Sequence, residues 1–169
     1  MTSGPTYTPI QTQTVSGSST TTVTFLSIPQ TYTDLIISCN ASVASGSITF
    51  YAQYNSDTST SYSWIRLFGN GTSTASDGAG SPNYTYVRPG EVSSTWAYQQ
   101  LNIMNYANTT TNKTTLWKNM NTDTTNTAGV DVGVSLWRNT SAINRVDIKV
   151  TGSNLVAGST FTLYGIAAA

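Results

Sequence analysis

Short runs in which apolar and polar residues alternate, each ended by turn residues, constrain the fold of this chain most strongly. In the run 143–150, Val146, Ile148 and Val150 alternate with charged residues. A period of two is typical of a strand with one buried face. No segment keeps the 3.6-residue apolar period of an amphipathic helix over about eleven residues. The sequence therefore predicts an all-β fold.

About ten short strands are expected, with turn signals between them. They cover residues 20–28, 34–41, 47–54, 62–68, 84–88, 95–106, 113–121, 130–137, 143–150 and 160–166. Residues 70–83 are rich in Gly, Ser and Asp, and we expect a long loop there. Many short strands protect their edges by packing two sheets together, which predicts an antiparallel β-sandwich, jelly-roll-like. An immunoglobulin domain is disfavoured because its Cys–Trp–Cys pattern is absent.

The first 19 residues differ from the rest of the chain. They contain few apolar side chains and two prolines, Pro5 and Pro9. We expect residues 1–19 to form an extended N-terminal arm. Residues 20–169 are expected to form a single β-sandwich domain, because no linker divides them and their number suffices for one core. Residues 1–19 also lack the charged and apolar regions of a signal peptide.

Charged residues are scarce and balanced, making up 8% of the chain with a formal net charge of zero. Nucleic-acid binding needs a basic stripe, and adsorption to an anionic membrane needs excess positive charge, so neither partner is expected. No apolar run reaches the ~18 residues of a membrane helix. Aromatic residues, at 11%, argue against disorder. A neutral surface rich in Tyr, Asn and Ser is typical of contacts with proteins or glycans.

Residues suited to catalysis or metal binding are few. The chain has no histidine and one cysteine, Cys39, which excludes His-dependent triads and the usual zinc sites. We expect Cys39 to be buried in a strand. Most of the carboxylates are expected to cap turns. They are Asp34, Asp57, Asp77, Glu91, Asp123, Asp131 and Asp147. A glycosidase pair and a calcium loop remain as alternatives, but no catalytic, cofactor-binding or metal-binding residue is assigned, and no enzyme is expected.

The polar segment 56–61 lies between two aromatic-rich runs and contains Asp57. Its oxygen atoms raise the question of a metal or sugar site. Because it holds one carboxylate and no ligand spacing, we predict a hairpin turn instead. One strand ends at Tyr54, residues 62–68 return, and Asp57 is a turn-capping acceptor.

Several strands are apolar on both faces, which a sheet with one solvated face does not require. They are found in residues 34–38, 48–54, 63–68 and 102–106. Such strands are central strands lying under loops, or they form a subunit interface, and we expect a homo-oligomer. Trp64, Trp96, Trp117 and Trp137 also lie in strand patterns. We expect these to be core residues, with a sugar-binding platform as the alternative.

A resemblance to a known group of proteins rests on five segments. They are FTLYGI (161–166), VTFLSIPQTYTDLII (23–37), YNSDTSTSYSW with LFGNGTS (54–64 and 67–73), NYANTTTNKT (105–114) and LWRNTSAINRVDIKVTG (136–152). With these, most of residues 15–166 resembles small jelly-roll virion structural proteins of tailed bacteriophages. The group often has a Gly-Asp-Thr-Gly turn where this chain has Ser-Asp-Thr-Ser. No catalytic residues are carried over.

The resemblance implies a protein made in the host cytoplasm and placed on the surface of the virion. The first hypothesis is a capsid decoration (cement) protein, or head fibre, that docks on the major capsid protein or another virion protein and stabilises the head. It would be a cyclic homo-oligomer, with a trimer favoured, and residues 1–19 would make the docking contact. The alternative is a tail or fibre module that binds a receptor or host-surface glycan through loops 56–61, 70–83 and 121–129, gathered at one end of the sandwich.

Overall fold

The computed structural model describes residues 6–45, 49–89, 96–122 and 128–167. Within these ranges the chain forms twelve strands and no helix. No helix in the described part is long and apolar enough to span a membrane. The strands are β1 (Tyr7–Thr14), β2 (Thr22–Phe25), β3 (Asp34–Ala41), β4 (Thr49–Tyr54), β5 (Tyr62–Gly69), β6 (Thr74–Ala79), β7 (Thr85–Pro89), β8 (Ala97–Met104), β9 (Lys113–Thr122), β10 (Ala128–Trp137), β11 (Val146–Thr151) and β12 (Thr160–Ile166).

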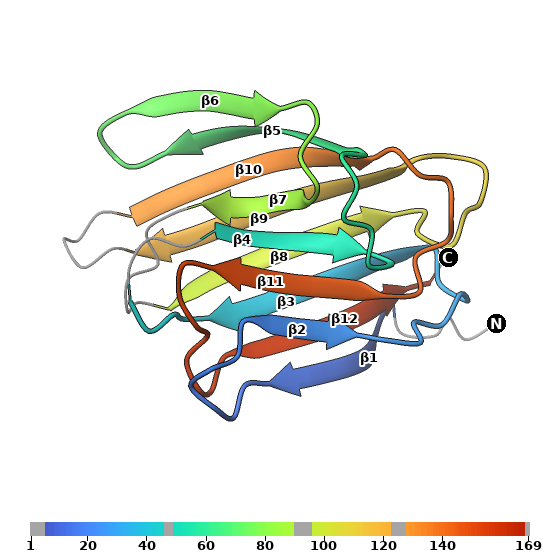
Figure 1. Cartoon of the computed structure of the whole chain (residues 1–169), viewed down its shortest axis with the longest axis horizontal. Helices are drawn as coiled ribbons and strands as arrows, with labels where there is room; N and C mark the ends of the chain where they lie inside the picture. Colours follow the sequence, from blue (N-terminus) through green and yellow to red (C-terminus); the bar gives the residue numbers. More distant parts are fainter. Residues whose placement is uncertain (1–5, 46–48, 90–95, 123–127, 168–169) are drawn as a thin grey trace.

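The strands form two sheets in which every pairing is antiparallel. The large sheet has the order β1-β12-β3-β8-β9-β10-β5-β6, and the small sheet has the order β2-β11-β4-β7. Figure 1 shows the small sheet lying over the large one, with β5 and β6 extending past β7. The predicted all-β antiparallel sandwich is confirmed.

Two hairpins enlarge the large sheet on one side of the molecule. The chain alternates between the sheets from β1 to β4, and then β5 and β6 form a hairpin at the edge of the large sheet before β7 returns to the small one. A second hairpin, β9 with β10, follows β8 and pairs with β5. We call β9, β10, β5 and β6 the extension; they lie at the top of Figure 1.

Apolar and aromatic side chains fill the space between the sheets. Phe50 of the small sheet stacks on Phe161 of the large sheet, with ring centroids 6.3 Å apart. Trp117 and Trp137 are each only 1% exposed. Cys39 is a free, fully buried thiol, as predicted, and burial raises its pKa. The alternating runs of the sequence therefore supply the inner faces of both sheets.

Part of the segment expected to be an arm is a strand of the domain itself. Residues 7–14 are β1, which pairs along β12 at one edge of the large sheet, with a bulge between Pro9 and Gln11. The polar side chains that indicated an arm do not prevent this, because an edge strand is held by backbone hydrogen bonds and tolerates proline at a bulge. Residues 1–5 lie outside the described part of the chain.

The expected loop 70–83 contains a strand, β6, which forms the other edge of the large sheet. Its sequence, TASDGA, lacks the large apolar residues that mark strands. The strand forms because it pairs with β5 along its whole length and because Asp77 is bound by Arg66 of β5. The prediction of an unstructured loop was therefore wrong over residues 74–79.

Candidate interaction surface

The strand β10 has its polar residues buried and its valines exposed. Asp131 and Ser135 face the interior at 3% and 1% exposure, while Val130, Val132 and Val134 face outward at 56%, 43% and 41%. Successive side chains point to opposite faces of a sheet, so burying one set exposes the other. The alternation in β10 is therefore inverted relative to an ordinary sandwich strand.

Contacts on the inner side explain this inversion. A Cβ atom on Gly133 would lie 2.3 Å from the Trp117 ring, so glycine makes room for the buried indole. Ser135 Oγ accepts a hydrogen bond of 3.2 Å from Trp117 Nε1. Asp131 accepts one of 3.1 Å from Arg66 Nη1. Because small and polar residues are needed beneath Trp117 and Arg66, the valines are left on the outside.

Neighbouring strands continue the exposed valines into one surface. The pairing places Val132 beside Leu67 and Val134 beside Ile65, and on the other side Val130 beside Met120 and Val134 beside Leu116. We call this surface the apolar face. It comprises Ile65, Leu67, Leu116, Met120, Val130, Val132 and Val134, which are 38–62% exposed. These fractions correspond to on the order of 600 Å² of exposed apolar surface, the upper end of what a typical monomer shows.

The apolar face is confined to the extension. At outward positions elsewhere on the large sheet, polar groups bond to one another, as Ser38 Oγ does to the Tyr98 hydroxyl at 3.3 Å. The outward side of the small sheet is also polar, and there Lys149 Nζ donates to Gln53 Oε1 at 2.6 Å. Only the two hairpins added to the large sheet present a continuous aliphatic surface among the residues that the structure describes.

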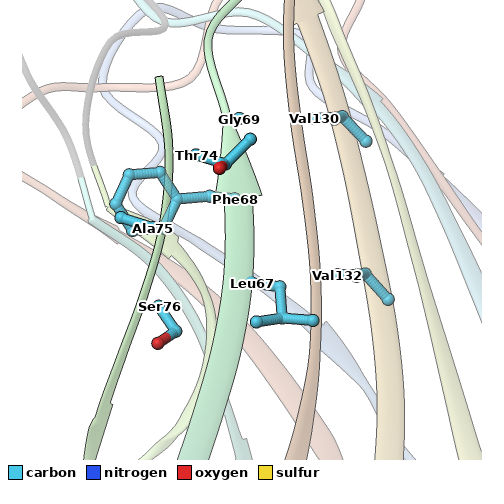
Figure 2. A pocket seen from close by; sticks show the side chains of 8 residues that line it. All are labelled: Leu67, Phe68, Gly69, Thr74, Ala75, Ser76, Val130 and Val132. Atoms are coloured by element: carbon cyan, nitrogen blue, oxygen red, sulfur yellow. The ribbon is translucent and has the colours of Figure 1, made fainter.

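The apolar face has both projecting side chains and hollows. Ile65 and Leu67 are the most exposed of its residues, at 61% and 62%. Beside them β6 carries only Ser76 and Gly78 at the paired positions. A hollow of about 460 Å³ lies at the end of β5 near Gly69. Figure 2 shows the residues of β5, β6 and β10 that line it. A second hollow lies at the other end of β5, next to Val134 and Leu136.

An ion-pair cluster beneath the apolar face holds the extension together. Arg66 binds Asp77 of β6 through two nitrogens, at 2.5 and 2.8 Å, and Asp131 of β10 through the third, at 3.1 Å. Its guanidinium lies 4.2 Å from the Phe68 ring centroid and 5.4 Å from that of Tyr86. The hydrogen bonds from Arg66 lower the pKa of the Asp77 carboxyl. Three strands are thus joined by one side chain.

Of the carboxylates considered in the sequence, Asp77 and Asp131 are brought together on Arg66, and the other described ones lie at separate places in the fold. Asp34 accepts a hydrogen bond from the Asn105 amide at 2.7 Å, and Asp147 pairs with Arg145 at 2.9 Å. Glu91 and Asp123 lie outside the described residues. Within the described ranges, no group of three or more His, Cys, Asp or Glu residues is placed to hold a metal ion.

The tryptophans have different environments. Trp117 and Trp137 are core residues, as expected. Trp64 stacks on Tyr86 with ring centroids 4.0 Å apart. The expectation was wrong for Trp96, which precedes β8 and is 48% exposed. The loops of the glycan-binding alternative are not gathered at one end. Loop 56–61 lies at the end of β10, where Arg138 donates a hydrogen bond to the Thr60 carbonyl. The turn that follows Gly69 lies at the opposite end, beside Val130 near the beginning of β10.

The segment around Asp57 is a turn. Asn55 and Ser56 have positive φ values of 51° and 59°, and the Asp57 amide donates to the Tyr54 carbonyl at 2.9 Å. The Asp57 carboxylate accepts hydrogen bonds from the Ser59 amide at 2.8 Å and from Trp137 Nε1 at 2.6 Å. The predicted role of a turn-capping acceptor is confirmed. The predicted hairpin is wrong, because β4 lies in the small sheet and β5 in the large one, so the turn crosses between the sheets instead of joining two paired strands. The bond to Trp137 also ties the turn to the core, which the sequence did not indicate.

The Asp57 carboxylate is expected to stabilise the fold in a pH-dependent manner. Burial raises the pKa of Asp57, but hydrogen bonds from Ser59, Trp137 and Ser61 outweigh it and lower the pKa to about 2. The unfolded value is ~3.9, so the stabilisation is complete above pH ~4 and is lost as the pH falls towards 2. We expect Asp57→Asn to lower the free energy of unfolding by about 1–2 kcal/mol at pH 7.

Urea unfolding of both proteins at several pH values checks this prediction. The difference between the native protein and Asp57→Asn should shrink between pH ~4 and ~2, because the protonated carboxyl and the amide both lack the charge. A difference that stays constant over that range would contradict it.

Comparison of the chain with protein-family models, with curated proteins and with solved structures gave no match.

Proposed function

We propose that this chain is a non-enzymatic structural protein of a bacteriophage virion, a capsid decoration protein that stabilises the head. The observation that carries the proposal is the apolar face, an aliphatic surface on the outward side of β5, β9 and β10. A surface of this kind marks a site of protein–protein contact. A protein that works by attachment needs such a surface and a rigid fold behind it.

The energetics of the apolar face agree with this role. Covering on the order of 600 Å² of apolar surface contributes about 15 kcal/mol before association costs are subtracted. Those costs are about 4–15 kcal/mol. The remainder corresponds to a contact of moderate strength, as is suitable for a surface used in assembly, whether the partner is another copy or another virion protein.

The strand order supports the resemblance on which the virion assignment rests. With the two hairpins set aside, the sheets read β1-β12-β3-β8 and β2-β11-β4-β7. In this arrangement the chain wraps back and forth between two four-stranded sheets, which is the pattern of a jelly roll with two Greek keys. We interpret the fold as a jelly roll into which the hairpins β5–β6 and β9–β10 are inserted.

Quantitative mass spectrometry of purified virions tests the proposal. A decoration protein is expected at hundreds of copies per particle, and particles lacking it should release their DNA at a lower temperature. A few to a few dozen copies would identify the tail or fibre module instead, with a receptor or host-surface glycan as the ligand to be sought. Absence of the protein from purified virions would contradict both.

A further inference from the structure

We propose that the apolar face binds the same face of a second copy of this chain, so that two large sheets pack against each other around a two-fold axis. This inference rests on the proposed function in one respect, that the apolar face is an assembly surface. It goes further by naming the occupant of that surface and the direction of the symmetry axis.

The shape of the apolar face is self-complementary. Ile65 and Leu67 project from it, and two hollows lie beside them. One is lined by Leu67, Val130 and Val132 (Figure 2), and the other by Ile65 and Val134. A face that has both projections and hollows can interlock with its own copy. The best complement of a pleated sheet is a second sheet about 10 Å away, as in the interior of a sandwich.

The size of the apolar face fits a pair of chains. On the order of 600 Å² from each copy gives about 1,200 Å² in total, the lower limit of stable specific interfaces. A two-fold contact of this kind uses one patch twice, so no second complementary surface is required. Next to β9, polar residues of β8 border the apolar face, where Gln100 donates a hydrogen bond to Asn102, and they supply a polar rim.

The single charged residue on the described part of the apolar face, Lys118, is compatible with pairing of two copies and determines the direction of the two-fold axis. Lys118 is the one charged side chain at the outward positions of the described residues of the extension, and the pairing places it in one row with Val132 and Leu67. A two-fold axis across the strands through this row would bring the two lysines together, which is unfavourable. An axis along β10 places β9 over β5 of the other copy, so that Lys118 lies opposite Leu67 and near Ser76.

Measurement of the mass in solution tests the inference. Sedimentation equilibrium of the full chain at micromolar concentration should give twice the 18.0 kDa of one chain. Val132→Lys places a charge at the centre of the apolar face and should weaken pairing at least 100-fold. Lys118→Met should strengthen it. The matched control Asn40→Lys adds the same charge at an exposed outward position of β3 and should leave the pairing unchanged.

Cysteine cross-linking tests the direction of the axis. Chains carrying Lys118→Cys should form disulfide-linked pairs with chains carrying Leu67→Cys when the two are mixed, and each should cross-link poorly alone. Cys39 does not interfere because it is buried. Efficient cross-linking of Lys118→Cys with itself would overturn the axis along β10.

The outcomes separate this inference from the proposed function. A monomeric or trimeric mass for the native chain, or an unchanged mass for Val132→Lys, would overturn the pairing through the apolar face. If such a protein is still present at hundreds of copies in virions, the proposed function stands and the apolar face binds another virion protein. A paired protein that is absent from virions would leave the inference intact and overturn the proposed function.

Discussion

Replacing Gly133 with alanine is expected to lower the free energy of unfolding by about 3 kcal/mol, the upper end for overpacking a core. The added Cβ atom would lie 2.3 Å and 2.6 Å from two Trp117 ring atoms and 2.7 Å from the Ile65 carbonyl oxygen. Trp117 is 1% exposed and bonded to Ser135, so the indole has no free space to enter. The smaller entropy of the unfolded alanine chain offsets only about 0.4–1 kcal/mol.

Urea unfolding at neutral pH measures this loss. Gly80→Ala is the matched control, because a Cβ atom at that position meets nothing within 4 Å, and it should change the free energy of unfolding by less than about 0.5 kcal/mol. If Gly133→Ala proved as stable as Gly80→Ala, the packing of Trp117 on Gly133, and with it the explanation of the inverted strand, would be wrong.

Replacing Arg66 with methionine should destabilise the protein by about 3 kcal/mol, as removal of one member of a buried ion pair does. The Arg66 side chain is 10% exposed and Asp131 is 4% exposed, so water does not replace the lost contact well. Asp77, on β6, loses both hydrogen bonds from Arg66. We also expect amide hydrogen exchange in β6 to accelerate more than in the rest of the large sheet, because Arg66 adds a side-chain contact to the backbone pairing that holds this edge strand.

Two further variants control for this result. Arg145→Met also removes the partner of a buried carboxylate, because Asp147 is 1% exposed although Arg145 is 40% exposed, and it should lower stability as well. It leaves the contact between β5 and β6 intact, so it should not accelerate amide exchange in β6. Asp131→Asn combined with Arg66→Met should recover part of the stability, since the charge that Arg66 compensated is then absent. If Arg66→Met and Arg145→Met accelerated amide exchange in β6 equally, the role assigned to Arg66 in holding β6 would be wrong.

The sequence predicted the strands that have strong apolar alternation. The runs around Ile37, Ile148 and Leu163 became central strands, because their β-branched and large apolar residues favour a pleated, half-buried surface. β1 and β6 were missed because their side chains carry no such signal. Both are edge strands, and they are held by backbone pairing with β12 and β5, a contribution that depends on the neighbour and not on local composition.

The candidate site could be predicted only in part. The residues on both faces of β5 were recognised as apolar, and the structure leaves Ile65 and Leu67 of this strand exposed, not covered by a loop. Val130, Val132 and Val134 were missed as surface residues, although their period of two is plain in the sequence. A period of two does not show which face of the strand is buried. In β10 the buried face is the one next to Trp117 of β9 and Arg66 of β5, because these two side chains need small or polar residues beside them.

The pairing of β1 with β12 brings the two ends of the described chain to one edge of the large sheet, where Tyr7 lies beside Ile166. β5 is five strands away from β12, which corresponds to on the order of 25 Å at the usual spacing between strands. Cargo joined to either end would therefore be carried on the side of the molecule remote from the apolar face. A tag or domain fused at either end would therefore leave the apolar face free, which makes such fusions suitable for measuring its contacts.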